Sequence, residues 1–393
     1  MRLLAAALVF AATASPAAAQ HWTRSWSASP MPVRSGPDQQ ALALHDQTLR
    51  QVVRLSAGGN RLRLRLSNEC SPLDMDIGAV HVALVDAKGN VVPGTDRVVR
   101  FGGQAALFVP AGAPLLSDPI DLPVAPLSRL QVSIHFSGDV PRPTIHERPE
   151  ASLWVAPGDQ TGADKLKDAA AYRSGVALTG VEVDSERARR TVVTLGDSIT
   201  DGARITRDSD RRWPDVLAER LQAAGIDVGV SNAGISGNRV LHNGTGDNAL
   251  ARFDRDVLSV PGASHVLVLE GINDIGQGFR QNPPSLTPEA LVGAYRQMIK
   301  RAHARGVKIL FATILPFGGG GSWKPEADQL RRTVNQWIRT NKEADGFIDF
   351  DRAVADADNP LRMAATYDSG DHVHPNDAGY RAMGEAVDLK LFR

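Results

Sequence analysis

The chain has 393 residues, with 44 Lys and Arg against 44 Asp and Glu, so its formal net charge is zero. This balance argues against nucleic-acid binding as the main activity, because neutralising phosphates requires a basic surplus. Hydrophobic residues make up 42% and charged residues 22%, which is typical of a folded globular protein of about two domains. The single cysteine, Cys70, excludes an intrachain disulfide and a cysteine-built metal site.

Residues 1–19 have the pattern of a secretory signal peptide. A basic start is followed by a short apolar run and by the small residues Ala17 to Ala19. The run is shorter than the ~20 apolar residues that cross a bilayer, so we expect cleavage after Ala19 and no stable membrane insertion. The mature protein is then secreted or periplasmic.

Residues 20–183 show the two-residue period of β-strands. Leu62, Leu64 and Leu66 alternate with arginines, and residues 130–136 alternate in the same way. Glycine and asparagine at 58–60 supply turn chemistry, and long helical patterns are missing from this half. The pattern predicts an all-β, jelly-roll-like sandwich domain.

The polar segment 184–190 is the expected linker, and the period changes after it. From 191 to 393, strand-like runs alternate with helix-like stretches. The expected strands are 191–195, 228–231, 265–269, 307–314 and 347–350, and the expected helices are 213–223, 248–258, 288–304, 326–342 and 377–391. This alternation predicts a five-stranded parallel sheet covered by helices on both faces, a three-layer α/β/α sandwich. Sites in such sheets form at the carboxyl ends of the strands.

Four short polar blocks fall at the expected strand ends. They are residues 196–202 (GDSITDG), 232–238 (NAGISGN), 271–274 (GIND) and 371–375 (DHVHP). Each block alone could be an ordinary turn or cap. Because the carboxyl ends of parallel strands meet at one edge of the sheet, their joint occurrence indicates a single site.

The residue types in these blocks suit nucleophilic catalysis. A serine hydroxyl such as that of Ser198 needs a neighbouring base, and a histidine can accept its proton near neutral pH. Pro375 disfavours helix at His374, so Asp371 can fold back and bond one imidazole nitrogen. His372 is the rival base.

With these residues, the chain from 191 onward resembles the GDSL, or SGNH, hydrolase superfamily of esterases and lipases. The resemblance implies the SGNH hydrolase fold and a catalytic triad of Ser198, His374 and Asp371. It also implies an oxyanion hole made of the backbone N–H groups of Ser198 and Gly234 and the side-chain amide of Asn273. GDSI in place of GDSL is a common variation within that family.

The expected function is that of a secreted serine esterase that hydrolyses carboxylic esters, with short acyl groups favoured, through an acyl-enzyme. The alternatives are a polysaccharide O-acetylesterase, a lipase or lysophospholipase, and a non-catalytic glycan-binding protein. The expected partner is a small-molecule, lipid or glycan ester. No metal or other cofactor is signalled, and the oligomeric state is open.

Three further features have competing interpretations. Trp22, Trp26 and Trp154 could stack on sugar rings or serve as buried anchors. The arginines of the segment 204–212 could meet an anionic substrate or form a solvated loop face. Cys70 is expected to be a buried structural thiol rather than a nucleophile, because nothing around it lowers its pKa.

Overall fold

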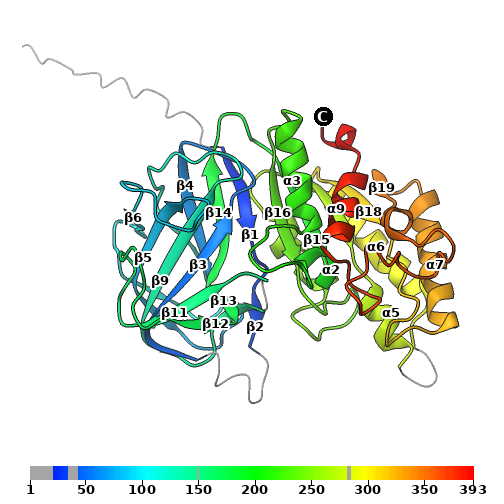
Figure 1. The fold of residues 1–393 in the computed structure, drawn as a ribbon, viewed down its shortest axis with the longest axis horizontal. Coiled ribbons are helices and arrows are strands. Elements are labelled where there is room, and N and C mark those ends of the chain that lie inside the picture. The colour runs from blue at the N-terminus through cyan, green and yellow to red at the C-terminus, as the bar shows by residue number, and fades with distance from the viewer. Residues whose placement is uncertain (1–20, 34–42, 148–149, 281–284) are drawn as a thin grey trace, which may run out of the picture.

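The computed structural model describes residues 21–33, 43–147, 150–280 and 285–393. Two bodies lie side by side, one built of strands and one of strands and helices (Figure 1). The last antiparallel strand ends at Asp184 and the first parallel strand begins at Thr191. The strand direction therefore changes across the segment where the hydrophobic period changes. The expected signal peptide lies outside the described residues.

The N-terminal body, called the β-domain below, consists of antiparallel sheets around one apolar cluster. Its strands are β1 Trp22–Ser27, β2 Met31–Pro32, β3 Leu44–Arg54, β4 Arg61–Ser67, β5 Met75–Val85, β6 Arg97–Val98, β7 Leu107–Val109, β8 Pro114–Leu116, β9 Arg129–Val140, β10 Thr144–Glu147, β11 Leu153–Pro157, β12 Ala170–Tyr172, β13 Ser174–Val176 and β14 Leu178–Asp184. They form a four-stranded sheet in the order β1-β14-β4-β8, a three-stranded sheet β13-β10-β2, and a seven-stranded sheet β12-β11-β3-β9-β5-β6 with β7 on β5.

Strand β4 shows why the alternating pattern folds this way. Leu62, Leu64 and Leu66 are fully buried in the apolar cluster. The arginines between them face the other side of the sheet, where Arg63 Nε lies 2.6 Å from the buried carboxylate of Glu182. The polar face of this strand is thus partly covered by its own ion pairs rather than only by water.

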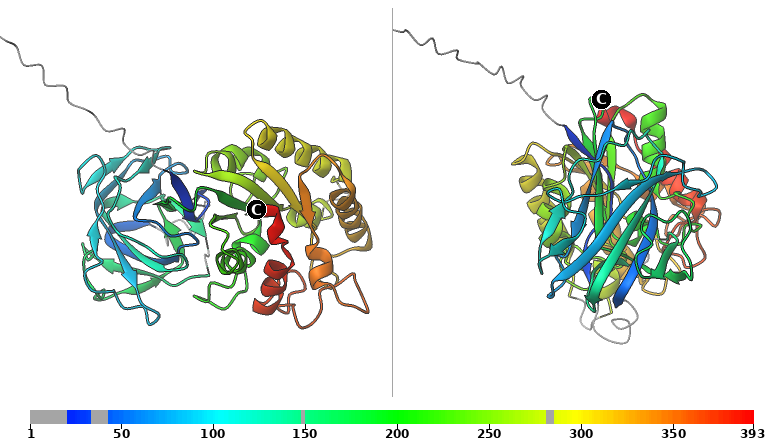
Figure 2. Two further views of the ribbon diagram at one scale, coloured as in Figure 1. Left: turned by 90° about the horizontal axis from the view of Figure 1, so that it is seen from above. Right: turned by 90° about the vertical axis from the view of Figure 1, so that its left-hand side faces the viewer.

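The C-terminal body is a five-stranded parallel sheet in the order β16-β15-β17-β18-β19 with helices on both faces (Figure 2). The strands are β15 Thr191–Gly196, β16 Gly229–Gly234, β17 Ala263–Leu269, β18 Lys308–Ala312 and β19 Gly346–Ile348. The helices are α2 Ser198–Asp201, α3 Trp213–Ala223, α4 Ala249–Phe253, α5 Ile272–Gly278, α6 Pro288–His303, α7 Pro325–Thr340, α8 Phe350–Val354 and α9 Asp377–Ala386, with a π-helical turn at Asp254–Leu258 and a 3₁₀ turn at Leu389–Phe392. The predicted three-layer architecture is confirmed. No helix of the described part of the chain is both long enough and apolar enough to cross a membrane.

Several local expectations were wrong. Phe350 begins helix α8 instead of ending the last strand, because Asp349 caps that helix and its side chain accepts from Arg352 N. The block 271–274 is not a loop: Gly271, at φ 124°, turns the chain from β17 directly into α5. The fourth block does not follow the fifth strand directly, since α8 intervenes. Helices as short as α5 and α8 give too few turns to show a period.

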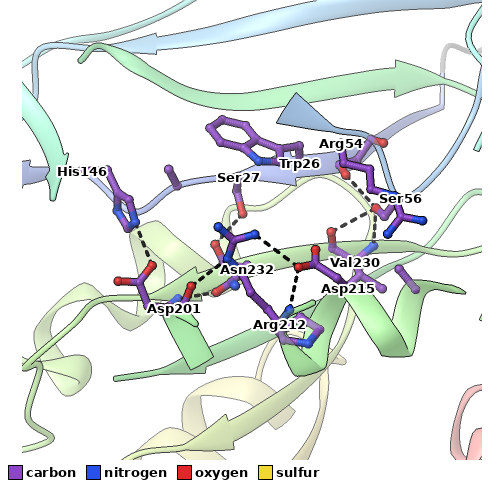
Figure 3. A pocket seen from close by; sticks show the side chains of 15 residues that line it. Trp26, Ser27, Arg54, Ser56, His146, Asp201, Arg212, Asp215, Val230 and Asn232 are labelled. Carbon is purple, nitrogen blue, oxygen red and sulfur yellow. Dashed lines mark hydrogen bonds and ion pairs between the residues drawn. The ribbon is translucent and has the colours of Figure 1, made fainter. Parts of the chain in front are cut away.

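The two bodies are joined along the edge of the parallel sheet. Strand β1 lies beside β16, the edge strand, and a Cβ on Gly229 would lie only 2.3 Å from Arg24 O. Ser27 Oγ donates to Asn232 O at 2.8 Å, and Ser56 Oγ accepts from Val230 N at 2.8 Å (Figure 3). The β-domain therefore covers a strand edge that would otherwise expose unpaired backbone groups.

One buried histidine far from the four blocks gives a testable stability effect. His265 in β17 is 5% exposed, and burial together with the positive charge of Lys308 lowers its pKa to about 4. In the unfolded chain a histidine has a pKa of about 6.5, so between these values the unfolded state binds more protons and acid favours unfolding. On acidification from pH 7 to 4.5, we expect the free energy of unfolding to fall by about 2 kcal/mol more in the wild type than in His265→Leu. Denaturant titrations at the two pH values measure this difference, and equal losses would contradict it.

Candidate active site

The nucleophile candidate Ser198 lies just beyond the carboxyl end of β15. Gly196 ends this strand, where a Cβ would lie 2.2 Å from Thr200 Oγ1 and 2.5 Å from Leu269 O, so only glycine fits. Asp197 caps α2, its side chain accepting from Ile199 N at 2.9 Å. The sharp strand-to-helix turn places Ser198 as the first residue of α2, 7% exposed.

The fourth block brings the base and the carboxylate to this serine. Ser198 Oγ lies 2.8 Å from His374 Nε2, and His374 Nδ1 lies 2.8 Å from Asp371 Oδ2. The backbone N–H groups of His374 and Val373 donate to Asp371 Oδ1 at 2.8 and 3.0 Å. Although partial burial opposes it, these bonds and the neighbouring imidazole hold the pKa of Asp371 well below its usual range. The carboxylate is therefore charged and fixes the imidazole with Nε2 toward Ser198.

The rival histidine points elsewhere. The backbone of His372 has a positive φ of 63°. Its Nδ1 lies 2.6 Å from Asp368 Oδ2, and about half of the side chain is exposed. Of the two histidines in the DHVHP block, His374 and not His372 is therefore hydrogen-bonded to Ser198.

Gly234 does not lie where an oxyanion donor is needed. It ends β16 opposite Gly196, and its N–H already donates to Asn232 Oδ1 at 2.8 Å. A Cβ at this position would lie 2.3 Å from Asp201 N, so glycine is required there for the close packing of β16 against α2. The expected role of the Gly234 N–H in the oxyanion hole is therefore corrected, because that donor is occupied within the strand end.

Two other donors of the expected set are available, and a third lies nearby. The N–H of Ser198 has no acceptor within the described residues. Asn273 Nδ2 uses one hydrogen on Asn238 O at 2.9 Å, which leaves its second hydrogen free. Between β16 and Asn238 the chain turns at Gly237, exposed and with φ 81°, and no acceptor for its N–H is found in the described part of the chain. The backbone N–H of Gly237 is therefore available to a ligand, whereas that of Gly234 is occupied by Asn232.

Arg252 is a buried residue of this site that the sequence did not reveal. Its guanidinium donates to Gly196 O at 3.0 Å, Ala233 O at 2.7 Å and Asn238 Oδ1 at 3.0 Å, and its charge is balanced by Asp256. Through these bonds Arg252 connects the ends of β15 and β16 and the loop after β16. An arginine within an expected amphipathic helix gives no signal of such a role.

Buried acids lie behind the nucleophile turn. Burial raises the pKa of Asp197 to about 7 and raises that of Glu270 well above its usual range. Asp274 accepts from Val240 N at 2.7 Å and Leu241 N at 3.0 Å. Asp197 and Asp274 thus hold backbone N–H groups around the site, and within the described residues the hydrogen-bond partner of Ser198 Oγ is His374 instead.

The arginines of the segment 204–212 are engaged by protein groups. Arg204 Nε lies 3.3 Å from Asp371 Oδ2, Arg211 Nη1 lies 3.2 Å from Asp377 Oδ2, and Arg212 Nε donates to Asp201 O at 2.8 Å. The segment therefore ties α2 to the loop that carries the histidine. It does not present a row of free cations to an anionic substrate.

The tryptophans and the cysteine also differ in their surroundings. Trp22 lies under the guanidinium of Arg63 at 4.2 Å, and Trp26 lines the seam between the two bodies. Trp154 is 45% exposed and lines an open groove of about 660 Å³ on the outer face of β3, β9 and β11. Burial raises the pKa of Cys70 to about 11, so its thiolate is scarce at neutral pH.

A parallel sheet that carries a serine, a histidine and a carboxylate in one hydrogen-bonded chain at its carboxyl edge is the arrangement of a serine hydrolase. Residues 194–382 match the GDSL-like Lipase/Acylhydrolase family. This C-terminal domain therefore belongs to that family, and the resemblance inferred from the four blocks is confirmed.

Individual relatives are similar to part of the chain. The esterase TesA of Pseudomonas aeruginosa is 31% identical over 137 residues, which span 35% of this chain and 60% of TesA. A GDSL-like lipase from Bacteroides thetaiotaomicron is 22% identical with a TM-score of 0.39, over 51% of this chain and 87% of the other. An acetyl xylan esterase from Geobacillus stearothermophilus is 22% identical with a TM-score of 0.40, over 52% of this chain and 95% of the other.

Proposed function

We propose that the protein is a secreted serine esterase in which Ser198, His374 and Asp371 form the catalytic triad. The observation that carries this proposal is the unbroken chain of 2.8 Å contacts from Ser198 Oγ through the imidazole to Asp371. His374 accepts the serine proton as Ser198 attacks the ester carbonyl, and then donates it to the departing alcohol. Water hydrolyses the acyl-enzyme by the same route.

The negative charge that develops on the carbonyl oxygen needs fixed donors. Within the described residues, no acceptor is found for the N–H groups of Ser198 and Gly237 or for the second hydrogen of Asn273 Nδ2, and we assign the oxyanion hole to these donors. They come from three separate strand ends. Arg252 and Asp274 hold the intervening loop in place through the bonds described above.

A series of p-nitrophenyl esters from acetate to palmitate tests the proposal. We expect turnover, highest for short acyl chains, together with stoichiometric labelling of Ser198 by a fluorophosphonate. Turnover without labelling of Ser198 would overturn the assignment of the nucleophile. A lack of turnover across the whole series would favour the non-catalytic glycan-binding alternative.

Removing one oxyanion donor should slow the chemical step. Asn273→Ala loses the side-chain amide but keeps the helix, so we expect kcat to fall by roughly 10²- to 10³-fold with little change in the free energy of unfolding. Steady-state kinetics and thermal unfolding of the same preparation measure both quantities. An unchanged kcat would mean that this amide does not face the oxyanion.

An O-acetylated polysaccharide is the second candidate substrate, and the groove at Trp154 favours it. An exposed indole ring can stack on a sugar ring, and polar side chains such as Gln131 and Lys165 line the same groove beside apolar ones. Trp154→Ala should then raise KM for an acetylated oligosaccharide several-fold and leave p-nitrophenyl acetate hydrolysis unchanged. If the KM for the oligosaccharide is the same in Trp154→Ala and in the wild type, the groove does not take part in substrate binding.

The export proposal depends on residues 1–19. We propose cleavage after Ala19 and a periplasmic or extracellular product, in line with the basic start and short apolar run. N-terminal sequencing of the exported protein, with Gln20 as its first residue, is the expected result.

A further inference from the structure

The β-domain reaches the nucleophile helix through a buried histidine. His146 lies on β10, and its Nε2 is 3.0 Å from Oδ1 of Asp201, the last residue of α2 (Figure 3). His146 is 7% exposed and Asp201 5% exposed. The contact therefore joins a β-domain side chain to a residue one helical turn after Ser198, and both side chains are largely buried.

Asp201 also contacts the loop that carries Gly237. Its second oxygen, Oδ2, accepts from Ser236 N at 3.1 Å and from Ser236 Oγ at 2.6 Å. One carboxylate thus bridges His146, the nucleophile helix and the loop 235–238. Because β16 ends against α2 with no room for a Cβ at Gly234, the backbone of Asp201 also lies in close contact with the end of β16.

The same loop is also anchored in the β-domain by an apolar contact. Ile235 is fully buried and belongs to the hydrophobic cluster of the β-domain, not to the cluster of its own domain. Met31 of β2 lies in this cluster as well. The backbone between Gly234 and Asn238 is therefore held on one side by β-domain packing and on the other by Asp201.

The partners of His146 fix its protonation state. Nδ1 lies 3.0 Å from the carbonyl oxygen of Ser29, and Nε2 faces the Asp201 carboxylate, so both partners are acceptors. Both nitrogens can donate only when the ring is an imidazolium. Burial lowers the pKa of His146, but the charge and hydrogen bond of Asp201 together with the hydrogen bond to Ser29 outweigh burial and the repulsion from Arg212, so the net shift of the pKa is upward. The ion pair is charged, desolvated and geometrically fixed.

We propose that His146 is a positioning residue for the active site, holding Asp201 and thereby the nucleophile helix and the Gly237 loop in register across the domain boundary. The proposal rests on the proposed esterase function. It makes the β-domain a structural part of the catalytic site rather than an appended module. In this role His146 acts through Asp201 and does not contact the substrate.

Two substitutions separate the two bonds of the histidine. In His146→Asn the amide nitrogen stands near the former Nδ1 and keeps the bond to Ser29, but it cannot reach Asp201. In His146→Gln the amide nitrogen extends to the former Nε2 and can donate to Asp201. We expect kcat for p-nitrophenyl acetate to fall by about 10- to 100-fold in His146→Asn, with KM changed less than about threefold and substantial recovery in His146→Gln.

Kinetic constants are expressed per fluorophosphonate-titrated site, so that a smaller folded fraction does not count as a slower enzyme. His135→Asn is the matched control, since His135 Nε2 also bonds a carboxylate, that of Asp46 at 2.9 Å, but wholly inside the β-domain. That variant should keep the wild-type kcat. An unchanged kcat per site in His146→Asn would overturn the proposal, as would equal losses in His146→Asn and His135→Asn.

Ser236→Ala provides a second test that does not depend on the folding of His146→Asn. It removes the 2.6 Å bond to Asp201 Oδ2 and should lower kcat per site about 3- to 10-fold. An unchanged kcat here would contradict the bridging role of Asp201. Failure of the esterase function itself is recognised separately, because it would abolish turnover and Ser198 labelling in the wild type.

Discussion

Replacing Ser198 with alanine should reduce kcat for short-chain p-nitrophenyl esters by about 10⁴- to 10⁶-fold. The hydroxyl is the atom that forms the acyl-enzyme, and its removal leaves only what the donors and binding contacts contribute. Ser198 Oγ has one hydrogen-bond contact, with His374, so the folded state should be kept. The measurement is the steady-state rate together with circular dichroism and thermal unfolding.

The matched control for this variant is Ser259→Ala. Ser259 is exposed and its hydroxyl donates to the backbone oxygens of Asp254 and Arg255, far along the chain from the four blocks. That variant should retain wild-type turnover. Residual activity of Ser198→Ala above a few per cent, with the folded fraction unchanged, would remove Ser198 as the nucleophile.

The second large effect should separate the two histidines of the DHVHP block. We expect His374→Ala to lower kcat by about 10⁴- to 10⁶-fold, because among the described residues His374 is the base that contacts Ser198 Oγ. His372→Ala should stay within about threefold of the wild type, since the half-exposed ring of His372 pairs with Asp368 and not with Ser198. The reverse order of effects would require that the base be reassigned.

A phosphonate provides an independent measurement for this pair. Attack on phosphorus also needs the serine proton removed, so the second-order rate of fluorophosphonate labelling should fall in His374→Ala and not in His372→Ala. A normal labelling rate in His374→Ala would show that the serine is activated by some other group.

Much of the catalytic domain could be predicted because its signals are local. Most strands of the parallel sheet are short apolar runs, and the long helix α6 has a clear start signal in the capping residue Thr287 followed by Pro288. The triad could be predicted because its residues lie in blocks at strand ends, and Pro375 keeps His374 out of a helix. Short helices such as α5 and α8 were missed because they have too few residues to show a helical period in hydrophobicity.

The role of Gly234 shows where sequence reasoning about the site ended. The NAGISGN block holds two glycines, and the residues alone do not say which N–H is free. The choice depends on the Asn232 side chain, which occupies the Gly234 amide, and on the turn that exposes Gly237. Both are consequences of how β16 ends against α2.

The amino-acid sequence by itself determined the order of the elements, the change from antiparallel to parallel strands, and the chemical groups at the strand ends, because these follow from hydrophobic period and short-range backbone preferences. Only the tertiary structure decided which amide is free, which arginine braces the turn, and that His146 joins the β-domain to the nucleophile helix. Such contacts pair residues far apart in the chain, like His146 and Asp201, and buried charges are matched by position in space, which no local pattern records.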